Sequence, residues 1–280
     1  MINISEGRSI ETLTKLAHAA GSSLRDVHTD PSHHRSVFTL INDASHLVRD
    51  VHSLVFATIE ALDLRTHAGV HPRLGVADVI PFVPLDGASI EDAAVLRDQL
   101  AAWIAESFQL PVFLYGPLPD GTERSLPFVR KHAFVDLAPD VGPPVADARS
   151  GAITVGARPL LIAWNLWLTN TTLVRAKAIA TVLRKPGLRT LGLEVAGAVQ
   201  VSCNIIDVAT VSLADIYDEG TALLQDDERI ARVELVGLAP QLALDLVDPG
   251  RWGQLDLRPD ATIEARRARL AISWPEPDAR

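Results

Sequence analysis

Apolar residues recur along this chain with two different spacings, and the places where the spacing changes outline its elements. Runs with strand-like spacing lie at residues 3–6, 23–28, 34–41, 78–83 and 111–115. Runs with the spacing of a helical face lie at residues 9–20, 43–62 and 89–107. Gly21 is expected to end the first helix, and Asp43 or Ser45 to cap the second. The first part of the chain is thus predicted to alternate between strands and helices.

The same order of elements returns after residue 159. Strands are predicted at 160–168, 189–195, 198–206 and 230–237, and helices at 170–184, 212–225 and 261–273. Residues 116–159 hold many of the prolines and glycines and are predicted to be loop, short helix and connector. The order strand–helix–strand–strand–helix–strand, met twice, is that of the ferredoxin-like fold. We therefore predict an α+β protein of two ferredoxin-like (βαββαβ) subdomains, at residues 1–159 and 160–280.

Composition narrows the class of protein. The chain has 280 residues, just under two domains of about 150 residues each, and its 48% hydrophobic content is ordinary for a soluble globular protein. A formal net charge of −9 without a basic stripe argues against nucleic-acid binding. No apolar run reaches about 18 residues and no signal peptide is visible, so we expect no membrane span and a cytoplasmic location. The single cysteine, Cys203, excludes an internal disulfide and is expected to be a buried small hydrophobe.

Histidines are crowded into one quarter of the chain. Seven of the nine fall between residues 28 and 71: His28, His33, His34, His46, His52, His67 and His71. His46 and His52 fall in a predicted helix and are interpreted as bystanders. The segment 26–37 places three of the others, two carboxylates and Arg35 around a predicted turn between two strands. That segment either presents polar groups to a ligand at a strand end or is a solvated turn in which Asp30 makes an Asx turn.

A second candidate segment, residues 65–75, contains Gly69, Pro72 and Gly75 and is therefore predicted to be a loop. It places His71 between Arg65 and Arg73, which suits an anionic substrate. Cations nearby lower the pKa of an imidazole toward that of a neutral general base, and a guanidinium can bind a carboxylate through two hydrogen bonds. The alternative is an ordinary surface histidine.

Other kinds of site have less support. His67 and His71 are four residues apart, as in a zinc-binding helix, but the loop residues between them argue against a helix and no H-E-x-x-H pattern is present. A metal-dependent hydrolase remains an alternative, with ligands drawn from His28, His33, His34, His67 and His71. No G-x-G-x-x-G or Walker loop is present, so a dinucleotide or nucleoside-triphosphate site is not predicted. The glycines and prolines at 139–159 form either a cleft wall or a rigid connector.

A set of short strings, in order along nearly the whole chain, matches one known family. They are NISEGR (3–8), DVH (26–28), HRSVFT (34–39), GVHPRLG (69–75), ADVIPFVP (77–84), PVFLYG (111–116), PDVGP (139–143), GAR (156–158), LIAWN (161–165), QVSCN (200–204) and ELVGL (234–238). With these strings the chain resembles the formiminotransferase family, the tetrahydrofolate-dependent glutamate formimidoyltransferases. It resembles a stand-alone form without a cyclodeaminase domain.

The resemblance implies a fold, a reaction and a set of site residues. The family fold is two ferredoxin-like subdomains with a tunnel between them, usually in a homodimer. The reaction moves a formimino group between N-formimino-L-glutamate and N5 of tetrahydrofolate, in histidine degradation, with no metal and with possible coupling to a separate cyclodeaminase. The catalytic histidine of the family aligns with His71, as the general acid–base. The expected substrate- and folate-binding residues are His28, His34, Arg35, Arg65, Arg73, Asp140, Gly142, Gly151, Arg158, Asn165, Arg189 and Asn204.

The chain departs from the family pattern at positions expected to touch the site. It has His34 where the family usually has Asn, Trp167 where the family usually has a second Asn, and Arg232–Val233 in place of Gly-Ser. Lost hydrogen bonds to a substrate shift preference strongly. Two alternatives therefore stay open beside the transferase: a member with a shifted donor or acceptor, including a formyl group, and a reduced-folate-binding protein without transferase activity.

Overall fold

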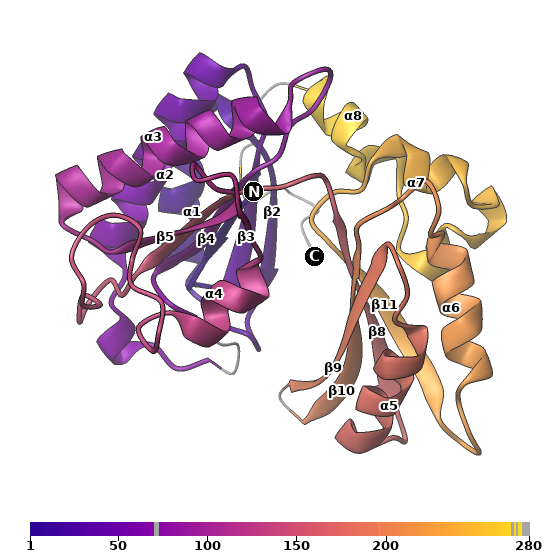
Figure 1. The fold of residues 1–280 in the computed structure, drawn as a ribbon. Helices are drawn as coiled ribbons and strands as arrows, with labels where there is room; N and C mark the ends of the chain where they lie inside the picture. The colour runs from indigo at the N-terminus through magenta and orange to yellow at the C-terminus, as the bar shows by residue number, and fades with distance from the viewer. Residues whose placement is uncertain (70–72, 196, 270–271, 273, 276–280) are drawn as a thin grey trace. The chain divides into compact units, whose positions relative to one another are not determined.

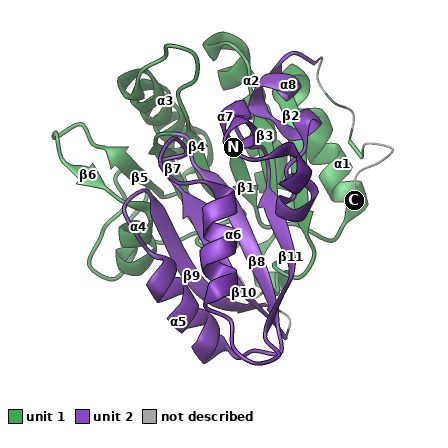
Figure 2. Cartoon of the chain, turned by 90° about the vertical axis from the view of Figure 1, so that its right-hand side faces the viewer, with its two compact units in different colours: residues 1–159, 270–280 green, residues 160–269 purple. Residues whose placement is uncertain are grey.

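The computed structural model describes residues 1–69, 73–195, 197–269, 272 and 274–275 (Figure 1). The chain divides into two compact units, which Figure 2 shows in different colours. Unit 1 comprises residues 1–159 and 270–280, and unit 2 comprises residues 160–269. Both units combine helices with a mainly antiparallel arrangement of strands, so the predicted α+β class is confirmed.

Unit 1 is built on a seven-stranded sheet. Its elements are, in chain order, β1 (Ile2–Ile4), α1 (Ile10–Ala19), β2 (Leu24–Asp30), β3 (Arg35–Leu40), α2 (Ala44–Ala61), β4 (Ala77–Phe82), α3 (Ile90–Phe108), β5 (Val112–Pro117), β6 (Glu123–Arg124), α4 (Leu126–His132) and β7 (Ile153–Ala157). The strand order is β2-β3-β1-β4-β7-β5-β6. The first four strands, with α1 and α2, make the predicted ferredoxin-like arrangement.

The remaining strands extend that arrangement. β7 pairs in parallel with β4 on one side and with β5 on the other, so it lies in the middle of the sheet. All five of its residues are buried. The proline and glycine content of residues 116–159 predicted a connector here, but the segment is a central strand. Sequence periodicity did not indicate it, because a short apolar run buried on both faces has no alternation.

Local sequence signals explain where the helices of unit 1 begin. The Ser9 hydroxyl accepts the N–H of Thr12 at the start of α1, and the Asp43 carboxylate accepts two N–H groups at the start of α2. Ser89 and Asp92 form a capping box at the start of α3. These three helices bury their apolar faces with Phe38 and its neighbours on one face of the sheet, whereas Val129 of α4 packs against Phe113 on the other.

Unit 2 is a ferredoxin-like subdomain. Its elements are β8 (Ile162–Thr169), α5 (Leu173–Leu183), β9 (Leu188–Val195), β10 (Ala198–Ile205), α6 (Leu213–Ala222), β11 (Arg229–Val236), α7 (Gln241–Asp245) and α8 (Ile263–Arg267). The strand order β11-β8-β10-β9 and the two helices between the strands are those predicted. α5 and α6 pack on the face that carries Trp164 and Val201, and the buried Trp164 indole donates a hydrogen bond to the carbonyl of Leu255.

The end of the chain differs from the expectation. The helix predicted at 261–273 is only α8, and the second subdomain, placed at 160–280, loses its last segment to unit 1. Ile272 and Trp274 pack against the unit 1 core, and the Ile272 N–H bonds to the carbonyl of Leu24. Among the helices that the structure describes, none has both the length and the apolar character needed to cross a membrane.

Candidate active site

The turn between β2 and β3 is fixed by its own side chains. The Asp30 carboxylate accepts the N–H groups of Ser32 (2.8 Å) and His33 (2.9 Å), and its second oxygen bonds Nδ1 of the His33 ring. Burial alone would raise the pKa of Asp30, but these hydrogen bonds outweigh it and hold the pKa at about 2. His34, next in the turn, has a positive φ of 50°, and its ring reaches the backbone of Gly7, three residues before α1.

The Glu6 carboxylate and the His34 ring both accept hydrogen bonds from backbone N–H groups that follow β1. One oxygen of the buried Glu6 accepts the N–H groups of Gly7 (2.9 Å), Arg8 (2.7 Å) and Ser9 (2.9 Å). The Gly7 N–H also lies 3.1 Å from Nδ1 of His34, which can accept it only when that nitrogen carries no proton. A Cβ at Gly7 would lie 2.4 Å from the Asp30 carbonyl oxygen, so the approach of the two segments requires glycine.

Two imidazoles and a guanidinium stack beside this backbone. The His34 and His67 rings lie 4.1 Å apart, and Nε2 of His67 lies 3.2 Å from the carbonyl oxygen of His34. That contact makes Nε2–H a donor. Nη1 of Arg73 approaches both ring nitrogens of His67, and of the two only Nδ1 can accept its N–H. Burial lowers the pKa of both histidines, and the charge of Arg73 lowers them further. Both rings are therefore neutral at neutral pH.

A buried carboxylate anchors the neighbouring loop and its arginines. Asp78, 1% exposed at the start of β4, accepts the Leu74 N–H at 2.6 Å and an Arg130 N–H at 2.8 Å. The charges of Asp78 and Arg130 also act on Arg35 and Arg73. Arg35 keeps part of its surface exposed, yet burial of its guanidinium lowers its pKa to about 10. Asp78 thereby holds Leu74, which follows His71 by three residues in the sequence.

We call this group the arginine–histidine cluster; its residues are Glu6, Arg8, Asp30, His34, Arg35, His67, Arg73, Asp78 and Arg130. With neutral imidazoles, its four guanidiniums and three carboxylates leave a charge of +1 in a chain whose formal net charge is −9. Three of these guanidiniums, those of Arg35, Arg73 and Arg130, are partly buried, while Arg8 is exposed. Partly buried cations favour a ligand that brings negative charge. The cluster is thus suited to bind a small carboxylate.

The structure brings together some of the residues predicted for this region. His34, Arg35 and Arg73 belong to the cluster. His28 lies on the same face of the sheet as Arg35, in one row with Val37. Arg65 is exposed, and its guanidinium bonds the Asp63 carboxylate, with Nη2 at 2.5 Å, rather than a group of the cluster. His71, the predicted catalytic residue, lies outside the described residues.

Four further predicted residues have contacts that stabilise the fold. The Asp140 carboxylate accepts the Leu114 N–H at 2.7 Å and an Arg124 N–H at 2.6 Å. Gly142 and Gly151 both have positive φ, and a Cβ on either would collide with a carbonyl oxygen. The half-buried Arg158 donates to the carbonyl of Pro159. Their role in binding folate stays a prediction.

In unit 2, three predicted residues lie on one face of the sheet. Asn165, Arg189 and Asn204 point away from the face covered by α5 and α6, in adjacent rows of the β9–β10–β8 pairing. We call this surface the polar face. Asn165 donates to Glu234 at 3.2 Å, and the neighbouring Trp167 indole donates to the same oxygen at 2.7 Å.

Several cluster residues were not singled out from the sequence. Asp78 and Arg130 are 52 residues apart, and Glu6 lies 28 residues from His34, so no local spacing reveals either contact. The available signal was a charge inside an apolar strand: Asp78 stands in ADVIPF, in which all six residues are buried. His67 was considered as a metal ligand and as one of the histidines on the two turns that the fold was expected to bring together, but it was not named as a binding residue. Within the described ranges, no three His, Cys, Asp or Glu side chains are placed to hold a metal ion.

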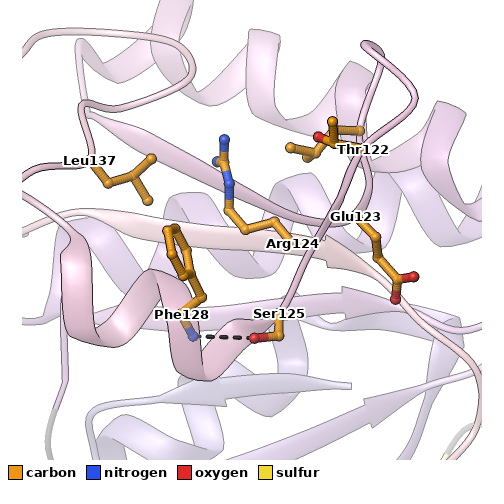
Figure 3. A pocket seen from close by; sticks show the side chains of 7 residues that line it. Thr122, Glu123, Arg124, Ser125, Phe128 and Leu137 are labelled. Carbon is orange, nitrogen blue, oxygen red and sulfur yellow. Dashed lines mark hydrogen bonds between the residues drawn. The ribbon is translucent and has the colours of Figure 1, made fainter.

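A separate cavity opens beside α4 and has a volume of about 570 Å³ (Figure 3). It is lined by Leu118, Thr122, Glu123, Arg124, Ser125, Phe128 and Leu137. Ser125 caps α4 by accepting the Phe128 N–H, as Figure 3 shows, and Arg124 is paired with Asp140. No cluster residue lines this cavity, so it gives no support for the chemistry predicted from the loop.

Comparison with known proteins identifies the family. Residues 1–158 match the model of the formiminotransferase domain, N-terminal subdomain. The chain is 33% identical over 267 residues to a glutamate formimidoyltransferase of Thermoplasma acidophilum and 32% identical over 268 residues to one of Streptococcus pyogenes, covering 86% of this chain and 88% of each relative. It is 31% identical over 270 residues to the formimidoyltransferase-cyclodeaminase of Rattus norvegicus, and spans about half (50%) of that protein. The chain therefore belongs to the formiminotransferase family.

Proposed function

We propose that this protein transfers a formimino group between N-formimino-L-glutamate and tetrahydrofolate. The single observation that carries the proposal is the arginine–histidine cluster, a local excess of cations that includes Arg73 and holds the Leu74 backbone through Asp78. N-formimino-L-glutamate is a small dicarboxylate. Its carboxylates are complementary to Arg35 and Arg73, whose guanidiniums are held near the Asp78 carboxylate.

In the proposed reaction, N5 of tetrahydrofolate attacks the formimino carbon and forms a tetrahedral intermediate. The bond between that carbon and the glutamate nitrogen then breaks, and the formimino group stays on N5. One proton must leave N5 and one must reach the departing glutamate nitrogen. We assign both transfers to His71, acting first as base and then as acid.

The neutral state of the neighbouring imidazoles supports this assignment. Burial and nearby guanidiniums lower the pKa of His34 and His67, and one of these cations, Arg73, follows His71 by two residues in the sequence. In the proposed reaction His71 acts first as the base and therefore starts in its neutral form. We also propose that the twelve binding residues named from the resemblance contact the two substrates.

The test is turnover by the purified chain. It is mixed with N-formimino-L-glutamate and tetrahydrofolate, and the 5-formimino product is converted by an added cyclodeaminase to the 5,10-methenyl form, which is followed by absorbance. 5-Formyltetrahydrofolate with glutamate serves as the second substrate pair. Turnover of the formimino pair is expected, and absence of turnover with both pairs overturns the proposal.

His71→Ala tests the acid–base role. The rate is expected to fall by roughly 10²- to 10⁴-fold, because a positioned general acid–base contributes that factor. His46→Ala is the matched control, because His46 lies on α2 with about half of its side chain (49%) exposed and bonds only within the first turn of that helix. Equal rates for the two variants would contradict the role of His71.

Reduced-folate binding without turnover is the second candidate. The observation that favours it is on the polar face, where the Arg232 guanidinium lies 4.3 Å from the centre of the Trp167 ring, both at positions where the chain departs from the family pattern. Folate binding with no turnover would select it.

We also propose a cytoplasmic homodimer whose product passes to a separate cyclodeaminase. The fused name of the rat relative supports that coupling.

A further inference from the structure

One buried polar group on the polar face of unit 2 has no partner. Gln200, in β10, is 2% exposed, and its Oε1 accepts no hydrogen bond from any residue that the structure describes. It alternates with Val199 and Val201, which belong to the core beneath α5 and α6, so its side chain lies on the opposite face. An unsatisfied buried amide is costly, and native proteins retain few of them. This suggests that a ligand completes the site.

The neighbours of Gln200 are held firmly in place. In its row across the sheet, Gln200 lies between Leu193 of β9 and Trp167 of β8, and Arg232 of β11 follows Trp167. The Trp167 indole is fixed by its 2.7 Å hydrogen bond to Glu234 and by the Arg232 guanidinium over its ring. The amide therefore has an apolar leucine on one side and an immobilised aromatic ring on the other.

That setting restricts the ligand. The unpartnered Oε1 needs an N–H donor. Because a primary amide carries its own donor beside that acceptor, a ligand amide whose N–H and C=O point the same way can bond both atoms. Leucine and tryptophan on the two sides favour a flat ring around that amide. A cyclic amide in a planar heterocycle has this chemistry, and the pteridine ring of folate contains one.

We propose that the Gln200 amide binds the cyclic-amide edge of the pteridine ring, with Trp167 and Leu193 flanking it. This inference rests on the proposed function, because it takes a reduced folate as the ligand. It assigns to unit 2 a specificity-determining contact with the ring, whereas the arginine–histidine cluster of unit 1 is proposed for the carboxylates of the other substrate.

The test compares Gln200→Met, which keeps the shape of the side chain, with the wild type. Two probes are titrated by calorimetry: 5-formyltetrahydrofolate, and a tetrahydropterin without the benzoylglutamate tail. Loss of the paired hydrogen bonds is expected to weaken both probes about 10-fold or more, and by the same factor. Gln225→Met is the matched control, because Gln225 is an exposed glutamine after α6, and no change in affinity is expected.

Thermal unfolding without ligand separates binding from structure. Because the Oε1 of Gln200 lacks a partner, Gln200→Met is expected to leave the melting temperature unchanged or raise it, while the rise caused by 5-formyltetrahydrofolate becomes smaller. A glutamine with a structural role would give the opposite sign. If Gln200→Met does not fold, Gln200→Asn takes its place, since a shortened amide should weaken both probes while remaining polar.

The outcomes are distinct. If the wild type binds neither probe, the proposed function and this inference fail together. If it binds both and the Gln200 variant binds as tightly, only this inference fails. Weakening of the folate without weakening of the tail-less pterin would place the amide against the tail, and a lowered melting temperature without ligand would make Gln200 structural. Either result overturns the inference.

Discussion

Asp78→Asn tests the electrostatic centre of unit 1. The Asp78 side chain is 2% exposed and lies 2.8 Å from the Arg130 guanidinium, whose side chain is 24% exposed. Asparagine has the same size and can still accept the Leu74 N–H. It cannot compensate the Arg130 charge, and it removes a carboxylate that attracts both Arg35 and Arg73. The substitution therefore isolates the contribution of one negative charge.

The magnitude follows from burial. A hydrogen bond to a charged group contributes about 1.5–3 kcal/mol, and removing one partner of a buried ion pair costs about 3–5 kcal/mol. Partial exposure of Arg130 places the expected loss near the lower end of the second range, at about 3 kcal/mol. For a unit of this size each kcal/mol lowers the melting temperature by roughly 2–4 °C, so a shift of roughly 6–12 °C is expected.

The assay is urea unfolding of the wild type and the variant, followed by circular dichroism, with thermal melts in parallel. The matched control is Asp136→Asn, because Asp136 is 65% exposed and pairs with His132 at 2.7 Å on the same unit. Its loss is expected to be below about 1 kcal/mol, as for other surface pairs. If Asp78→Asn destabilises the protein no more than Asp136→Asn does, the argument that Asp78 holds the cluster together is refuted.

Three further predictions follow from other contacts. Burial lowers the pKa of His34 below that of an unfolded histidine, so the unfolded chain binds the proton more tightly and stability is expected to fall as the pH drops below about 6.5. Urea unfolding at about pH 7.5 and about pH 5.5 should show a larger loss of stability for the wild type than for His34→Asn, because asparagine tolerates the positive φ. Equal losses would contradict this prediction. Gly7→Ala is expected to destabilise by more than about 2 kcal/mol, because its Cβ would meet backbone atoms at 2.4 and 2.6 Å, whereas Gly253→Ala, with open space around it, should change stability by less than about 0.5 kcal/mol. Burial raises the pKa of the Cys203 thiol to about 12, so a thiol reagent should label it only after unfolding; rapid labelling of the native protein would disprove that burial.

Regular alternation made most of the fold predictable. The strands and helices of unit 2 were found in order because every second residue of β8 and β10 is an apolar side chain of the core, a spacing that strand periodicity reveals. β7 was missed because it is buried on both faces and flanked by glycine and proline. The partner strands of β7 are brought together only by the tertiary fold, which no local pattern encodes.

The sequence located the candidate site, but it did not show which charged side chains are bonded to one another there. The crowded histidines pointed to the turn at Asp30 and to the loop beyond His67, and the structure brings His34 and His67 into contact. Which cations join them depends on distant residues such as Arg130. Arg65 was assigned to the site because it is close to His71 in the sequence, yet its guanidinium is bonded to the carboxylate of Asp63, two residues earlier.

The return of Ile272 and Trp274 to the first core has a consequence for biosynthesis. Unit 2 is, in chain order, an insertion between two parts of unit 1. A ribosome releases all of unit 2 before it releases the residues that cover Leu24. Unit 2 therefore has time to fold while unit 1 still exposes part of its apolar surface, and a chaperone that recognises such surfaces would bind the nascent chain at unit 1.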